Sequence, residues 1–281
     1  MSEITLRKYH GLGNDYLVYD PIRNEALLQE RQIRQLCSRN IGVGADGILY
    51  GPVLEDDEIK VRIFNPDGSE AEKGGNGIRI FSRYLKDAGY VEGEKYVLTT
   101  KAGKTEVTFL SADGSRMQVD MGYPKFQAKD IPVVGFGEEI IGESIFFCDN
   151  FYNATCVSMG NPNCVILLEE ADSKKAMQLG PYVERSKYFP NRINLQLCRV
   201  IDRGNIQIEI YERGAGYTYA SGTGACAAAA ASHRMGLVDD VVTVHMHGGD
   251  LLVEFAEDGR IDMTGPVVYI GKITLAEHFF A

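Results

Sequence analysis

Apolar and polar positions alternate along most of this chain and follow a helical period in only a few stretches. On either side of the turn-rich segment HGLGND, and later in the chain, alternation predicts strands over 4–9, 16–19, 48–50, 59–64, 96–100, 105–110, 117–121, 144–150, 152–159, 164–168, 206–211, 241–245, 251–255 and 261–264. Helical spacing predicts helices over 25–39, 75–88, 172–179, 181–188 and 225–235. The pattern therefore indicates a mixed α/β chain.

Two segments share one design, in which a polar glycine-rich turn runs directly into an apolar helix. Residues 64–84 read FNPDGSEAEKGGNGIRIFSRY, and residues 211–232 read YERGAGYTYASGTGACAAAAAS. Placing Gly75 on Gly222 needs an offset of 222 − 75 = 147 residues, and the same offset aligns Asn14 with Asn161. Because 281 residues exceed what one hydrophobic core usually organises, the repeat indicates two similar domains.

Composition and charge exclude several classes of protein. Hydrophobic residues make up 44% of the chain and charged residues 24%, and no apolar run approaches the roughly 18 residues that span a bilayer. The net charge of −10 argues against a nucleic-acid partner, because phosphate binding requires clustered cations. No secretory signal is recognisable at the N-terminus, so we expect a cytoplasmic protein with no membrane partner.

The second glycine turn is the strongest candidate for a binding site. Alanines at 227–231 leave the following helix almost without a polar face, so we expect it to be buried on all sides. Its free N–H groups at 222–224, and those of the repeat at 75–77, favour an anion such as a small carboxylate or phosphate. The alternative is that these glycines only permit tight turns.

Five segments together resemble the diaminopimelate epimerase family: HGLGNDY, GVGADG, NPDGSEAEKGGNGIR, MGNPNCV and YERGAGYTYASGTGACA. The resemblance covers nearly the whole chain. It implies an α/β (α+β) fold of two pseudo-symmetric domains, each a curved, mainly antiparallel sheet wrapped around a central helix. The last strand would return to the first domain, which gives domains at 1–122 plus 267–281 and at 123–266. The resemblance also implies an active site in the interdomain cleft and permits a homodimer.

Members of that family invert the α-carbon of an amino acid without pyridoxal phosphate or a metal, so the resemblance implies no cofactor and a small amino-acid-like substrate. They use two cysteines on opposite faces of the substrate, one as thiolate base and one as thiol acid. Cysteine suits both roles because its reference pKa of about 8.5 allows either protonation state near neutral pH.

This chain departs from the family at the positions that transfer protons. Gly74 stands where the family motif has the first cysteine, and Ser221 stands where it has the second. Asn163 replaces a histidine, and Tyr217 replaces the second glutamate of the motif around Glu212. Glycine has no side chain to exchange a proton and a serine hydroxyl is a far weaker acid than a thiol, so the standard two-thiol inversion is excluded.

The residues expected to bind an amino-acid head group are retained. These retained residues are Asn14, Asn65, Gly75, Asn76, Asn161, Asn194, Arg213, Gly222 and Thr223. We also expect the substituted Asn163 to take part in binding. The six cysteines form no CxxC pair or metal-ligand spacing, and we expect Cys164 and Cys226 to lie in the core rather than to replace the lost thiols.

Other side chains could supply a base or an acid. Lys73 is a candidate base if desolvation lowers its pKa, and the alternative is an exposed loop lysine. Glu212 could take an α-proton or activate Ser221, with Tyr217 or Tyr219 as the acid, and the alternative is a carboxylate paired with an arginine.

Three hypotheses follow for the function. In the first, the protein is an isomerase-like enzyme whose altered acid–base set leads to isomerisation, tautomerisation, elimination or cyclisation. In the second, it is an inactive paralogue that binds an amino acid. In the third, it is a family epimerase whose cysteines were replaced deliberately, which fits the changes at Gly74, Asn163 and Tyr217 less well.

Overall fold

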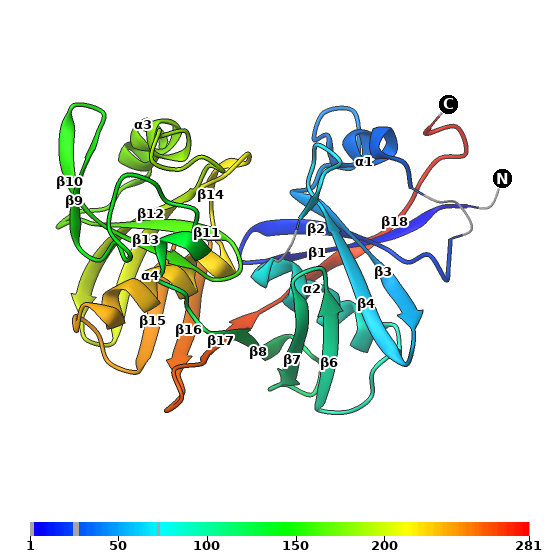
Figure 1. Ribbon diagram of the computed structural model, residues 1–281. Coiled ribbons are helices and arrows are strands. Elements are labelled where there is room, and N and C mark those ends of the chain that lie inside the picture. Colours follow the sequence, from blue (N-terminus) through cyan, green and yellow to red (C-terminus); the bar gives the residue numbers. More distant parts are fainter. Residues whose placement is uncertain (1–2, 25–27, 72–73, 281) are drawn as a thin grey trace. The chain divides into compact units, whose positions relative to one another are not determined.

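The structure is a computed structural model that describes residues 3–24, 28–71 and 74–280, and the chain divides into two compact units. Unit 1 comprises Met1–Val119 and Gly265–Ala281, and unit 2 comprises Asp120–Thr264 (Figure 1). In each unit two helices pack against a mainly antiparallel sheet, and this sheet agrees with the fold that the resemblance implied. Within the described ranges, no helix has the length and apolar character needed to cross a membrane.

The strands of unit 1 are hydrogen-bonded in the order β18-β1-β2-β3-β4-β6-β7-β8, with parallel pairs at β2/β3 and β4/β6. Helix α2 packs against β1, β2 and β3, and α1 packs against β3. The elements are β1 (Thr5–Gly11), β2 (Asn14–Tyr19), α1 (Glu30–Cys37), β3 (Gly47–Glu55), β4 (Glu58–Phe64), β5 (Glu70–Ala71), α2 (Gly75–Asp87), β6 (Lys95–Thr100), β7 (Gly103–Phe109), β8 (Arg116–Gly122) and β18 (Val268–Thr274).

Unit 2 repeats this topology, with the order β9-β10-β11-β12-β13-β15-β16-β17 and parallel pairs at β11/β12 and β13/β15. Helix α4 packs against β10 to β13, β15 and β16, whereas α3 packs against β12 to β14 and β9. The elements are η1 (Ala128–Asp130), β9 (Glu143–Phe147), β10 (Asn150–Ser158), β11 (Pro162–Leu167), α3 (Ser173–Glu184), β12 (Asn194–Asp202), β13 (Asn205–Glu212), β14 (Gly216–Thr218), α4 (Gly222–Arg234), β15 (Val241–Met246), β16 (Gly249–Phe255) and β17 (Ile261–Pro266).

The 147-residue repeat extends to element lengths and strand register. Helices α2 and α4 both contain 13 residues and begin 147 positions apart, and β3 and β12 both contain nine. The parallel pairing of Tyr16 with Gly47 in unit 1 recurs as the pairing of Asn163 with Asn194 in unit 2. The sequence repeat is therefore a repeat of hydrogen-bonding geometry.

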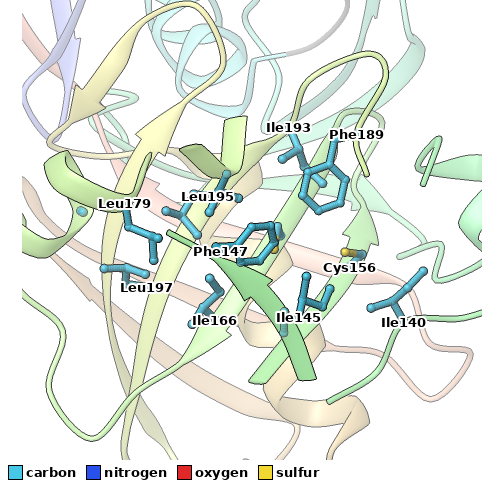
Figure 2. Close-up of a cluster of buried hydrophobic side chains, with 14 of the residues drawn as sticks. Ile140, Ile145, Phe147, Cys156, Ile166, Leu179, Phe189, Ile193, Leu195 and Leu197 are labelled. Carbon is cyan, nitrogen blue, oxygen red and sulfur yellow. The ribbon is translucent and has the colours of Figure 1, made fainter. Parts of the chain in front are cut away.

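The two units fill their cores differently around these helices. All residues of α4 from Gly222 to Ser232 are buried, so the alanine run allows sheet strands to approach on every side, as expected. Helix α2 instead buries larger side chains such as Phe81 and Leu85. Unit 2 also contains a cluster of buried hydrophobic side chains on the side of α3, which includes Phe147, Leu179 and Leu197 (Figure 2).

Several sequence predictions need correction. The two helices predicted over 172–179 and 181–188 are one helix, α3, with Pro181 inside it. Pro181 removes one hydrogen bond of this helix, that of its own missing N–H, and three further residues follow it before α3 ends. Strand β12 was not predicted at all. The strand predicted over 144–150 ends at Phe147, because Cys148 and Asp149 turn with positive φ angles.

The helix predicted over 25–39 is α1, which spans eight residues. Residues 25–27 of that prediction lie outside the described part of the chain. The helix predicted to start at Ala225 begins three residues earlier, at Gly222.

Candidate functional site

The first turn of α4 presents two hydroxyl groups. Ser221 is the N-cap, with φ −141° and ψ 121°, and its Oγ accepts a hydrogen bond from the Gly224 N–H at 3.2 Å. The Thr223 hydroxyl lies 3.5 Å from Ser221 Oγ, and both side chains are almost fully buried. Gly222 completes this turn without a side chain, so backbone donors and two hydroxyls meet at one helix end.

A cluster of carboxamides connects to this turn. Asn161 Nδ2 donates to Thr223 Oγ1 at 3.1 Å, and Asn163 Nδ2 donates to the Asn161 carbonyl at 2.8 Å and to Asn161 Oδ1 at 3.1 Å. Asn163 Oδ1 in turn accepts from Asn194 Nδ2 at 3.3 Å and from Gln196 Nε2 at 3.1 Å. Asn163 and Gln196 have no exposed surface. The structure thus brings three of the predicted asparagines together with Thr223.

Gln196 was not identified from the sequence. It follows Asn194 by two positions on β12, so both side chains lie on the same face of the strand. A polar residue between the apolar Leu195 and Leu197 was the signal that could have revealed it, but β12 itself was not predicted.

The turn between β13 and β14 carries Arg213 and is fixed from two sides. The backbone N–H of Arg213 donates to Asn194 Oδ1 at 2.8 Å, and its guanidinium donates to the Asn191 carbonyl at 3.1 Å. The next N–H, of Gly214, donates to Glu184 Oε1 at 3.0 Å. Glu184 is only 3% exposed, and sequence analysis missed it because it lies on α3, 30 residues away. A buried carboxylate therefore helps to hold the arginine-bearing turn.

The candidate acid–base residues lie beside the same turn. Glu212 ends β13, is half-buried and pairs with Gly216 of β14. The Tyr217 hydroxyl donates to Glu209 Oε2 at 2.7 Å. Burial raises the pKa of Tyr217, and the bond to the Glu209 carboxylate raises it further, so this phenol is held in its neutral form. Tyr219 is exposed and packs edge-on against Tyr217.

The equivalent helix start in unit 1 lacks a capping side chain. Gly74 is the N-cap of α2, with φ −144° and ψ 110°, and the next residues, Gly75 and Asn76, are buried. A Cβ atom at Gly74 would lie 3.8 Å from Ile63 Cδ1, an ordinary contact distance. Neither the backbone nor the surroundings require glycine at this position.

Asn76 links α2 to the loop that follows β1. Its Nδ2 donates to Asn14 Oδ1 at 3.0 Å, and Asn14 Nδ2 donates to Asp46 Oδ2 at 2.8 Å. Nearby, Asp15 pairs with Lys8 and Arg39. Burial alone would raise the pKa of Asp15, but the hydrogen bonds from these two cations outweigh burial and lower it.

The remaining predicted site residues lie apart from these networks or outside the description. Asn65 Nδ2 donates to Ser69 Oγ at 3.0 Å in the exposed turn after β4. Lys73 lies outside the described residues. Over the described ranges, no three His, Cys, Asp or Glu side chains are grouped closely enough to hold a metal ion.

The two cysteines that were expected in the core are buried there. Cys226 lies on α4 with no exposed surface, and Cys164 is equally buried on β11, as predicted. A hydrogen bond with Cys156 and burial raise the pKa of Cys164 well above its ordinary value, so its thiolate is strongly disfavoured.

Comparison with known proteins gives close relatives over almost the whole chain. The profile of the family described as diaminopimelate epimerase matches residues 6–127 and 155–270. Diaminopimelate epimerase 2 of Nostoc sp. is 46% identical over 275 residues, which is 98% of this chain and 96% of that protein. Diaminopimelate epimerase of Moorella thermoacetica is 39% identical over 94% of this chain and 96% of that protein.

Solved structures share the fold at low sequence identity. A hydroxyproline epimerase from Agrobacterium vitis superposes with a TM-score of 0.73 at 14% identity, covering 100% of this chain and 93% of that one. A PhzF-family protein from Bacillus anthracis superposes with a TM-score of 0.64 at 16% identity, covering 98% and 100%. The family profile, the identities and the repeated fold together show that this chain belongs to the diaminopimelate epimerase family.

Proposed function

We propose that this protein is a cofactor-independent, isomerase-like enzyme that acts at the α-carbon of a small amino acid with an altered acid–base set. The observation that carries the proposal is the first turn of α4. Ser221 Oγ accepts from the Gly224 N–H and Thr223 Oγ1 accepts from Asn161. The 3.5 Å contact between the two hydroxyls can use only one of their protons, so at least one is available for another acceptor. Such a turn suits the carboxylate of an amino acid.

The proposed chemistry is one-sided. Gly74 offers no group that exchanges a proton, whereas the unit 2 turn carries Ser221 and, close in sequence, Glu212 and Tyr217. We assign Glu212 as the base and Ser221 or Tyr217 as the acid partner. Because these groups all belong to unit 2, we expect the α-hydrogen to be removed and replaced on the same face, so that exchange is faster than inversion.

The test is incubation with L,L-diaminopimelate in deuterium oxide, with exchange followed by mass spectrometry and configuration by chiral chromatography. The proposal expects deuterium at the α-carbon without rapid formation of the meso isomer. Exchange should be lost in Ser221→Ala or Glu212→Gln and kept in Ser144→Ala, which alters an exposed serine of β9. Rapid conversion of the L,L to the meso isomer would overturn it.

A second function, binding of an amino acid without turnover, is favoured by the use of Ser221 as a helix cap. Its Oγ already accepts from a backbone N–H, which is the ordinary role of an N-cap serine. Thermal stabilisation by diaminopimelate with no deuterium exchange would identify this function.

A further inference from the structure

The hydrogen bonds beneath α4 run in one direction, and this direction is set by the backbone. The Arg213 N–H is only a donor, so the Asn194 oxygen must face it and the Asn194 amino group must point away. That amino group donates to the Pro162 carbonyl at 3.0 Å and to Asn163 Oδ1. The orientation of Asn194 is therefore fixed without reference to any ligand.

The next link is fixed in the same way. Asn163 Nδ2 donates to the Asn161 carbonyl, which is only an acceptor, so the Asn163 oxygen faces Asn194 and Gln196. Asn161 then accepts a hydrogen bond at Oδ1 and must direct its own amino group to Thr223. The Thr223 hydroxyl consequently accepts from Asn161, and its own proton is left for another acceptor, either Ser221 Oγ at 3.5 Å or a ligand.

We infer that Asn163 and Asn194, supported by Gln196, are positioning residues that hold the Thr223 hydroxyl as a hydrogen-bond donor to the ligand carboxylate. This inference rests on the proposed function and deepens it. Their burial supports this role, because Asn163 and Gln196 have no exposed surface, and Asn194, at 6% exposed, already uses its carboxamide within the protein. They act on the ligand through Thr223.

Gln196 places a polar side chain against the start of α4. A Cβ atom at Gly224 would lie 3.0 Å from Gln196 Nε2, so the carboxamide lies directly against the first turn of α4. The equivalent contact in unit 1 is apolar, with Leu49 Cδ2 3.2 Å from a Cβ atom at Gly77. Among the described residues, Gln196 Oε1 is buried without a hydrogen-bond partner, so this carboxamide keeps an unused acceptor beside the turn.

The test combines affinity with side-chain NMR. Dissociation constants for meso-diaminopimelate would be measured for the unmodified protein, Thr223→Val, Asn163→Leu and the double variant. If Asn163 acts through Thr223, each single change weakens binding about tenfold and the double change weakens it no further. Losses that multiply to about a hundredfold would overturn the inference. Asn24→Leu is the matched control, because Asn24 is also a buried, hydrogen-bonded asparagine but lies in unit 1.

A measurement without ligand separates this inference from the proposed function. The Asn161 carboxamide signals should shift in both Thr223→Val and Asn163→Leu and stay in place in Asn24→Leu. If the unmodified protein binds no diaminopimelate, the proposed function fails. Independently of that result, Asn161 signals that do not shift in these variants would overturn the inference that Asn163 acts through Thr223. If Asn163→Leu does not fold, the near-isosteric Asn163→Asp, which keeps the acceptor and removes the donor, replaces it in the NMR measurement.

Discussion

The starts of α2 and α4 have the same backbone conformation, but only one of them carries a side chain at the N-cap. Their N-caps, Gly74 and Ser221, have φ and ψ angles that agree to within about ten degrees, and each is followed by a 13-residue helix. Only Ser221 offers a side chain, and it caps its helix. The fold therefore preserves two equivalent positions, while side-chain chemistry survives at one of them.

The two units also reverse the hydrogen bond between loop and helix. In unit 1 the helix residue Asn76 donates to Asn14 at the start of β2, whereas in unit 2 Asn161, just before β11, donates to the helix residue Thr223. The series of hydrogen bonds in unit 1 continues from Asn14 to the carboxylate of Asp46, which accepts the last hydrogen bond of the series. The series in unit 2 ends on the Thr223 hydroxyl, which can still donate a hydrogen bond. A symmetric fold thus carries an asymmetric site.

The largest expected effect comes from making the two helix starts alike. Gly74→Cys combined with Ser221→Cys supplies one thiol at each start, and the space at Gly74 accepts a Cβ atom without displacement of its neighbours. Because a positioned acid or base typically contributes 10²–10⁴-fold, we expect interconversion of L,L- and meso-diaminopimelate to rise at least about a hundredfold in the double variant.

Either single cysteine variant is the control for this gain. A lone thiol should support exchange of the α-hydrogen without comparable inversion. Equal inversion by a single variant would show that the asymmetry between Gly74 and Ser221 does not limit the reaction.

The next largest effect concerns the packing around Gly47 of β3 in unit 1. A Cβ atom at Gly47 would lie 2.5 Å from the Phe64 carbonyl and 2.6 Å from the Tyr16 ring, so Gly47→Ala should destabilise the protein by about 3 kcal/mol. Urea unfolding followed by circular dichroism would measure this change. Gly74→Ala is the control, and a loss there as large as at Gly47 would contradict the contact argument.

The sequence predicted the repeat, the start of α2 at Gly75 and, three residues late, the start of α4, because glycine turns and an alanine run leave a clear pattern. It could not predict the direction of the hydrogen bonds beneath α4, since Asn163 and Asn194 each have a donor and an acceptor, and only the backbone groups around them orient the carboxamide. Glu184 was equally inaccessible, because its partner Gly214 becomes a neighbour only when α3 packs on the sheet. Local patterns reveal elements, whereas contacts between elements orient the site.

A smaller effect separates capping from catalysis at Ser221. Ser221→Ala removes the acceptor for the Gly224 N–H and should cost about 1 kcal/mol, whereas Ser221→Gly should cost only a few tenths of a kcal/mol. Urea unfolding would measure both changes, and deuterium exchange would be lost in both. A variant that loses stability and keeps full exchange would remove Ser221 from the proposed chemistry.

The smallest effect is a gain. Gly74→Ser gives α2 the cap that α4 already has, and the extended backbone at Gly74 is one that serine adopts readily. Because glycine is only slightly worse than serine as an N-cap, we expect stabilisation of about 0.5 kcal/mol, seen as a small rise in the urea midpoint. Deuterium exchange should not change, since a hydroxyl without a base partner is a poor acid. A stability gain with unchanged exchange would show that Gly74 is retained at a cost to folding, whereas a loss would show that unit 1 excludes a side chain there for steric reasons.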